Sequence, residues 1–139
     1  MGTTGAQGVA PRHIIAIVDD DPLVRETLND LLDSAGYSSV AFSSAERFLK
    51  SKRLAKVACL ITDMRMPGTT GIELHQRVVA AGHAIPTILI TAYPDDTTRA
   101  RATRAGILCY LPKPFPPEAL LACVASALSG RRDDFSRRS

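Results

Sequence analysis

VACLITDMRMPGTTGIEL, residues 57–74, is the stretch that decides which fold we expect. Val57 to Thr62 is nearly all apolar, which is typical of a strand buried on both faces of a parallel sheet. Asp63 follows this strand directly. From Gly71 to Ala81, apolar side chains recur at three- and four-residue steps, which predicts an amphipathic helix. A strand, a loop and a helix form the repeating unit of α/β proteins.

The same alternation extends over the rest of the chain. Further apolar runs predict strands at 13–18, 85–91, 107–111 and, with a weaker alternating pattern typical of an edge strand, 38–42. Amphipathic patterns predict helices at 22–35, 44–51, 95–105 and 117–129. Five successive βα units imply a parallel sheet with helices on both faces, joined by right-handed crossovers. The helix at 95–105 has only alanines for an apolar face, so we expect it to be loosely docked.

The composition indicates one domain without a membrane span. The chain has 139 residues, 45% of them hydrophobic, which is enough for one core. No apolar run approaches the roughly 20 residues that cross a bilayer. Cys59, Cys109 and Cys123 are odd in number and form no C-x-x-C, so we interpret them as buried free thiols rather than disulfides or zinc ligands. This usage suits a reducing compartment, and we expect a cytoplasmic protein.

The net charge of +3 lies at the two ends of the chain. Residues 1–13 and 130–139 carry the whole excess, and the residues between them are balanced. A nucleic-acid surface needs basic residues clustered on a folded face, so we expect no nucleic-acid binding by this chain alone. We expect a flexible leader at 1–11, one folded domain at 12–129 and a tail or linker at 130–139.

Acidic side chains follow two of the predicted strands. Asp19 and Asp20 come directly after the first strand, and Asp63 ends the third. In open α/β sheets the binding crevice lies at the carboxyl ends of the strands, so these carboxylates should meet there. They would repel one another without a cation, and Mg²⁺ prefers such ligands together with phosphate oxygens. Asp21 precedes Pro22, and we interpret it as a helix N-cap.

Two further side chains suit a phosphoryl group at the same edge. Thr91 ends the fourth strand and offers a hydroxyl, and Lys113 follows the fifth strand and offers a positive charge. Together with a metal ion they could hold the oxygens of a phosphoryl group, which is most of what phosphoryl transfer requires. Asp63 lies at the centre of the set, so we predict that it is the nucleophile.

Four motifs in order resemble the receiver domains of two-component response regulators, and more narrowly those of the FixJ type. The motifs are IVDDDPLVR (17–25), LITDMRMPGTTGIEL (60–74), ILITAY (88–93) and AGILCYLPKPF (105–115). The resemblance covers about residues 12–129. It implies a flavodoxin-like receiver fold, with a five-stranded parallel sheet in the order 2-1-3-4-5 and five helices on both faces.

The resemblance implies a role for each residue of the metal site. Asp63 would accept the phosphoryl group from the phosphohistidine of a histidine kinase. Asp20 would bind Mg²⁺ directly and Asp19 mainly through water, while the backbone carbonyl of Arg65 and the carboxylate of Asp63 would complete the site. Mn²⁺ would serve as a substitute.

The resemblance also implies a switch. Thr91 and Lys113 would contact the phosphoryl group, Thr91 would then turn inward, and the ring of Tyr110 would rotate after it. The Lys113–Pro114 peptide bond would be cis. The signalling surface would be the fourth helix, the fifth strand and the fifth helix.

We also expect particular residues to set the lifetime of the phosphorylated state, and particular proteins to bind this chain. Arg65 and Tyr93 would border the phosphoryl site, so we expect them to tune the lifetime of the phosphorylated state. A sensor histidine kinase or phosphotransfer protein would dock near Asp63, against the first helix and the loop after the fifth strand. Phosphorylation would promote a homodimer. The protein would not be a turnover enzyme, since it would phosphorylate itself once and lose the group slowly by hydrolysis.

Two alternatives differ in function class. The first is a protein-binding module that works without phosphorylation. The second is a Mg²⁺-dependent phosphohydrolase with an aspartyl-phosphate intermediate, but such enzymes usually have a second acid where this chain has Arg65. FixJ-type regulators usually carry a helix-turn-helix output domain, and residues 130–139 are too few for one. A single-domain receiver and a piece of a longer regulator both stay open.

Overall fold

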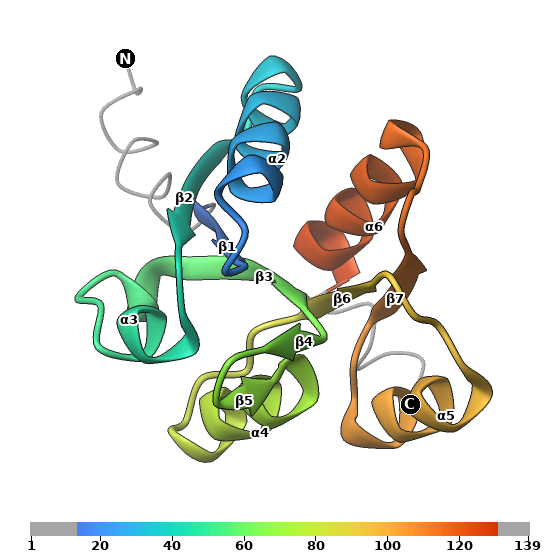
Figure 1. Ribbon diagram of the computed structural model, residues 1–139. Helices are drawn as coiled ribbons and strands as arrows, with labels where there is room; N and C mark the ends of the chain where they lie inside the picture. The colour runs from blue at the N-terminus through green and yellow to red at the C-terminus, as the bar shows by residue number, and fades with distance from the viewer. Residues whose placement is uncertain (1–13, 131–139) are drawn as a thin grey trace.

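The computed structural model describes residues 14–130, and it contains the expected parallel sheet (Figure 1). The predicted leader, the tail beyond residue 130 and the strand start at His13 lie outside the described residues. Five strands form the sheet: β1 Ile14–Val18, β2 Ser38–Phe42, β3 Val57–Asp63, β6 Thr87–Thr91 and β7 Cys109–Pro112. Their order is β2-β1-β3-β6-β7 and every pairing is parallel, so the predicted 2-1-3-4-5 topology is confirmed.

Five helices cover the two faces of the sheet. They are α2 Pro22–Ser34, α3 Ala45–Leu49, α4 Gly71–Ala80, α5 Asp96–Ala105 and α6 Pro117–Gly130. Figure 1 shows α2 and α6 on one face, with α3, α4 and α5 on the other. Two elements were not predicted: a 3₁₀ turn at Leu54–Lys56, and a small antiparallel pair of β4 Arg65–Met66 with β5 Thr69–Thr70.

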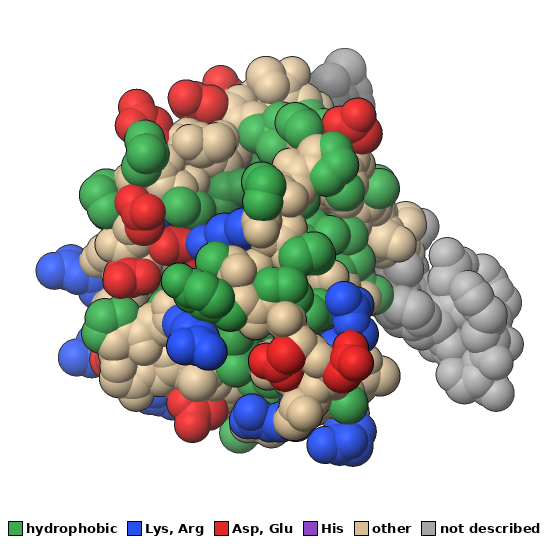
Figure 2. Space-filling view, turned by 45° about the vertical axis from the view of Figure 1, so that its right-hand side comes forward, with side chains coloured by type: hydrophobic (Ala, Val, Ile, Leu, Met, Phe, Trp, Pro, Cys, Tyr) green, Lys and Arg blue, Asp and Glu red, His purple; other side chains and the backbone are tan. Residues whose placement is uncertain are grey.

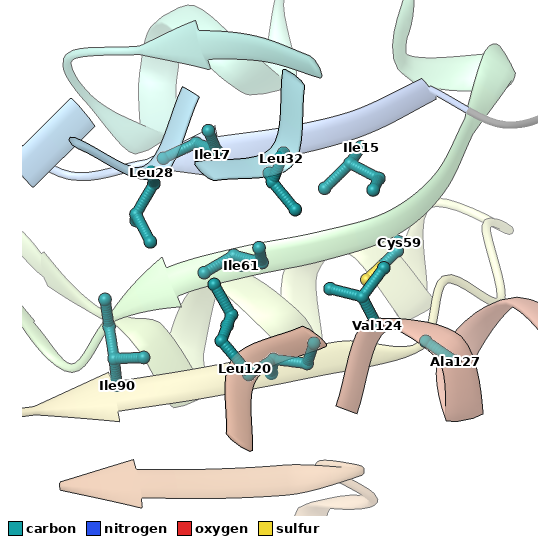
Figure 3. Close-up of a cluster of buried hydrophobic side chains, with 11 residues drawn as sticks. Ile15, Ile17, Leu28, Leu32, Cys59, Ile61, Ile90, Leu120, Val124 and Ala127 are labelled. Atoms are coloured by element: carbon teal, nitrogen blue, oxygen red, sulfur yellow. The ribbon is translucent and has the colours of Figure 1, made fainter. Parts of the chain in front are cut away.

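The alternation of side chains along β1 explains the two layers. Ile15 and Ile17 point into the cluster under α2 and α6, which includes Leu28, Leu120 and Val124 and is drawn in Figure 3. Ala16 and Val18 belong to a second cluster with residues of α3 and α4 on the opposite face. Successive strand residues face opposite sides, so a strand with a helix on each side must be apolar throughout. All seven residues of β3 are buried, and its first five, Val57 to Ile61, are apolar; the polar pair Thr62 and Asp63 comes only where the strand reaches the edge of the sheet.

Two strands begin later than predicted, each for a local reason. β6 starts at Thr87 rather than Ile85, because Pro86 has no N–H to give to a sheet ladder. β7 starts at Cys109 rather than Ile107, because the N–H of Ile107 bonds to the carbonyl of Ala102 and closes the end of α5. Helix α3 is also shorter than the predicted 44–51.

Helix α5 buries little, in agreement with its composition. Ala102 is the one residue of this helix that is buried. The helix is held near its ends instead: the N–H of Asp95 donates to the hydroxyl of Tyr110 (3.3 Å), and Nε2 of His75 lies 3.0 Å from the carbonyl oxygen of Ala105. Within residues 14–130, no helix has the length and apolar character needed to cross a bilayer.

Candidate functional site

The predicted site residues meet at the carboxyl edge of the sheet. Asp19 and Asp20 follow β1, Asp63 ends β3, Thr91 ends β6, and Lys113 follows β7. One carboxylate oxygen from each of the three aspartates lies within 4.8 Å of the other two. The strands β1, β3, β6 and β7 lie side by side and parallel in the sheet, so the topology brings together side chains that are far apart in the sequence.

The carboxylate of Asp63 is held at both oxygens. Nζ of Lys113 lies 3.0 Å from Oδ1, and the backbone N–H of Arg65 donates to Oδ2 at 3.2 Å. Asp63 is 8% exposed, so the group is sheltered but reachable from the edge of the sheet. A carboxylate in this position is fixed in orientation and faces a positive charge, which suits a nucleophile that must accept an anionic group.

Asp19 has an oxygen that suits a metal ion. Asp19 is 1% exposed, and its Oδ2 has no hydrogen-bond partner among the residues that the structure describes. Burial raises the pKa of Asp19, and the neighbouring charge of Asp63 adds to this, although the N–H of Asp21 and the charge of Lys113 oppose it. A buried oxygen without a partner is costly. The Asp19, Asp20 and Asp63 donor set therefore fits Mg²⁺, which takes carboxylate oxygens and keeps several waters.

Lys113 provides the positive charge of the site. Its Nζ lies 3.7 Å from Oδ2 of Asp19 in addition to its contact with Asp63. Partial burial alone would lower the pKa of Lys113, but the hydrogen bond to Asp63 and the charges of Asp63 and Asp19 outweigh it and raise the pKa. The ammonium group therefore stays charged at neutral pH. The Lys113–Pro114 peptide bond is cis, as the resemblance implies.

Thr91, Arg65 and Tyr93 border the same edge. Thr91 is 2% exposed, and its hydroxyl oxygen accepts from the N–H of Tyr93 at 3.0 Å. The guanidinium of Arg65 lies over the ring of Tyr93, 5.2 Å from its centroid. The pair thus joins β4, which begins two residues after β3, to the loop after β6. The position of the Arg65 carbonyl relative to a metal ion stays a prediction.

Tyr110 lies half-buried on β7, beside α5. Its hydroxyl accepts from the N–H of Asp95, and the guanidinium of Arg99 lies 4.6 Å from its ring centroid. Asp21 caps α2 as predicted, since its Oδ1 accepts from the N–H of Leu23.

Sequence reasoning did not assign two residues that support the site. Nη1 of Arg25 donates to the backbone carbonyl of Asp19 at 2.7 Å. Gly71 lies so close to β3 that a Cβ there would be 2.6 Å from the carbonyl oxygen of Asp63. Arg25 could have been suspected, because it stands in the motif IVDDDPLVR one turn into a helix and long helical side chains point toward the N-terminus. The contact of Gly71 depends on how α4 packs on β3, and the sequence carries no direct signal of it.

Comparisons with known proteins agree with this geometry. The family model described as "Response regulator receiver domain" matches residues 15–125. The chain is 37% identical over 114 residues to the transcriptional regulatory protein FixJ of Bradyrhizobium diazoefficiens, covering 82% of this chain and 56% of FixJ. Among solved structures, the response regulator StyR has 41% identity and a TM-score of 0.79, covering 90% of this chain and 63% of StyR. The structure described as FixJ-N has 32% identity and a TM-score of 0.75, covering 84% of this chain and 93% of FixJ-N.

The chain thus spans a little over half the length of FixJ. The part that is shared contains the edge of the sheet where Asp19, Asp63, Thr91 and Lys113 lie.

Proposed function

Because the chain belongs to the response regulator receiver domain family of two-component signalling, we propose that it accepts a phosphoryl group on Asp63 from the phosphohistidine of a histidine kinase or phosphotransfer protein. The observation that carries this proposal is the pairing of Asp63 with Lys113 at 3.0 Å, beside the unpartnered buried oxygen of Asp19. The result is a nucleophile, a countercharge and a cation ligand within one small edge of the sheet.

The chemistry follows from these positions. An oxygen of the Asp63 carboxylate attacks the phosphorus, a P–O bond forms, the P–N bond of the phosphohistidine breaks, and its electron pair stays on the imidazole. Lys113 balances the charge on the phosphoryl oxygens, and the hydroxyl of Thr91 donates to one of them. Mg²⁺, or Mn²⁺ in its place, would be held by Asp19, Asp20, Asp63 and the carbonyl of Arg65, and would supply positive charge to the phosphoryl oxygens.

The product is a switch rather than a turnover catalyst. We propose that Thr91 turns toward the phosphoryl group, which frees space for the ring of Tyr110 and alters the surface formed by α5, β7 and α6. Figure 2 shows this side of the molecule: hydrophobic side chains gather in its upper and middle part, acidic ones lie along the upper edge and the left, and side chains of both charges lie below. A surface of this kind could bind a second copy, which is the proposed homodimer.

The phosphoryl group would be lost slowly by hydrolysis. The guanidinium of Arg65 lies over the ring of Tyr93, and the backbone N–H of Arg65 bonds to Asp63, which supports the proposal that the two side chains restrict the approach of water to the aspartyl phosphate. Arg65→Ala and Tyr93→Ala should each shorten the lifetime of the labelled protein. If both variants lose the label at the wild-type rate, Arg65 and Tyr93 do not restrict the access of water.

The kinase would reach Asp63 across an apolar groove of about 610 Å³ between α2 and the segment after β7. Leu23, Val24 and Phe115 line the groove, and Lys113 lies at the end that meets the phosphoryl site. Leu23 is 67% exposed, so an apolar helix of a partner could cover it without any rearrangement. Three free cysteines among the described residues are consistent with the proposed cytoplasmic location.

Phosphoryl uptake from acetyl phosphate tests the proposal. We expect labelling of the wild type that requires Mg²⁺, disappears in Asp63→Asn, and persists in Asp96→Asn, a control at an exposed carboxylate on α5. Absence of labelling in the wild type would favour the phosphorylation-independent binding module. Continuous release of phosphate over many turnovers would favour the phosphohydrolase, and labelling of Asp63→Asn would show that another carboxylate is the acceptor.

A further inference from the structure

Arg25 links helix α2 to the loop that carries the acidic residues. It is the fourth residue of the helix, and its Nη1 reaches back to the carbonyl oxygen of Asp19 at 2.7 Å. We propose that Arg25 is a positioning residue for the metal and phosphoryl site, and that it acts by holding the peptide unit between Asp19 and Asp20. This inference rests on the function proposed above.

Three polar atoms of Asp19 are fixed by the protein. Its N–H donates to the carbonyl of Phe42 at 3.2 Å, its Oδ1 accepts from the N–H of Asp21 at 2.9 Å, and its carbonyl oxygen accepts from Arg25. The fourth, Oδ2, has no hydrogen-bond partner among the described residues, and Nζ of Lys113 lies 3.7 Å from it. Within residues 14–130, Arg25 is the one donor to the Asp19 carbonyl, so this atom would lose its partner if the guanidinium were removed.

Asp20 depends on the same peptide unit. Its side chain is exposed and makes no hydrogen bond with any residue in the described part of the chain. The peptide bond is planar, so the oxygen of Asp19 and the nitrogen and Cα of Asp20 lie in one plane. By holding that oxygen, Arg25 sets the plane from which the Asp20 carboxylate projects toward Asp63.

The charges at the site make this anchor necessary. One carboxylate oxygen from each of Asp19, Asp20 and Asp63 lies within 4.8 Å of the other two, and without a metal ion the single charge of Lys113 does not balance the three carboxylates, which repel one another. Asp20 is the exposed member, and it is therefore the one that can turn away into solvent. Without Arg25 the loop can relax in this direction, and a cation would have to draw Asp20 back before it could bind.

The test uses Mn²⁺ alone, with no phosphoryl donor, and follows free Mn²⁺ by electron paramagnetic resonance. Arg25→Met keeps the apolar stem and removes the donor; we expect the Mn²⁺ dissociation constant to rise about tenfold. In Arg25→Gln the shorter side chain does not reach the carbonyl of Asp19, so we expect the same rise in the dissociation constant. This variant serves if Arg25→Met does not fold. Arg47→Met, which changes an exposed arginine on α3, should leave the constant unchanged. In metal-free protein, the ¹⁵N order parameter of the Asp20 amide should fall in the Arg25 variants only.

The outcomes separate this inference from the proposed function. If the wild type binds Mn²⁺ and is labelled, but a folded Arg25 variant has the wild-type dissociation constant and the wild-type order parameter at Asp20, the role of Arg25 is disproved and the proposed function stands. A lower urea midpoint with unchanged Mn²⁺ affinity would likewise reduce Arg25 to a structural residue. A wild type that neither binds Mn²⁺ nor takes up phosphoryl would overturn both.

Discussion

The close approach of α4 to β3 gives a test of how the proposed phosphoryl site is built. Gly71 is the first residue of α4, and its N–H bonds to the carbonyl of Met64 at 2.9 Å. A Cβ at this position would clash with Cδ1 of Leu89 and would lie 2.6 Å from the carbonyl oxygen of Asp63. The side chain of Leu89 can turn, but Asp63 belongs to a central strand whose backbone is fixed by its neighbours. Gly71→Ala must therefore move the helix or the strand.

The expected cost can be estimated from general values. Overpacking of this kind costs about 1–3 kcal/mol. The higher helix propensity of alanine would offset this loss in the free energy of unfolding by at most about 1 kcal/mol, and by less at the first position of a helix. We expect a net loss of about 2 kcal/mol in the free energy of unfolding, which corresponds to a fall of roughly 5–10 °C in Tm for a domain of this size.

Urea unfolding followed by circular dichroism measures this loss. Gly36→Ala is a suitable comparison, because a Cβ there meets nothing within 4 Å and its cost of about 1 kcal/mol comes only from the positive φ of 91°. The rate of phosphoryl uptake should also fall in Gly71→Ala, since Asp63 is displaced. An unfolding midpoint at or above that of the wild type would refute the steric reasoning.

Three other predictions concern single side chains. Burial lowers the pKa of His75, although its bond to the carbonyl of Ala105 opposes this, so the unfolded chain binds the proton better than the folded one. Stability should therefore fall as the pH drops through the usual histidine value of about 6.5, and urea midpoints at pH 7.5 and 5.5 should differ less in His75→Gln. Burial raises the pKa of Cys59 to about 12, so iodoacetamide at pH 8 should modify this thiol only after unfolding, as mass spectrometry would reveal. Lys113→Met removes the charge 3.0 Å from Asp63 and should slow phosphoryl uptake about 100-fold with an unchanged circular dichroism spectrum.

The topology and the meeting of the polar side chains at the sheet edge could be predicted because both follow from the order of apolar and polar residues. Apolar runs such as Val57 to Thr62 must be covered on both faces, and this condition with right-handed crossovers leaves few arrangements. The acids after β1 and β3 then meet Lys113 by topology alone. These positions could be predicted because each polar side chain ends a strand or follows one within two residues.

The details that escaped prediction depend on backbone hydrogen bonds. β7 begins two residues late because the N–H of Ile107 is already used by the end of α5, and no residue-by-residue propensity expresses that competition. The pairing of Arg65 with Thr70 is likewise too short to leave a pattern. Arg25 donates to the backbone carbonyl of Asp19. Every residue has such a carbonyl, so the amino-acid type at position 19 gives no sign of this bond.

The way α5 is attached has a consequence for protein engineering. The helix contributes one buried residue to the interior and is held by hydrogen bonds near its two ends. Most of its outward-facing side chains therefore contribute little to the stability of the fold. Arg99 is an exception, because it covers Tyr110. Exposed positions such as Ala100, Arg101 and Arg104 could be exchanged in libraries to redirect the domain to a new binding partner, while the sheet and the proposed phosphoryl site remain as they are.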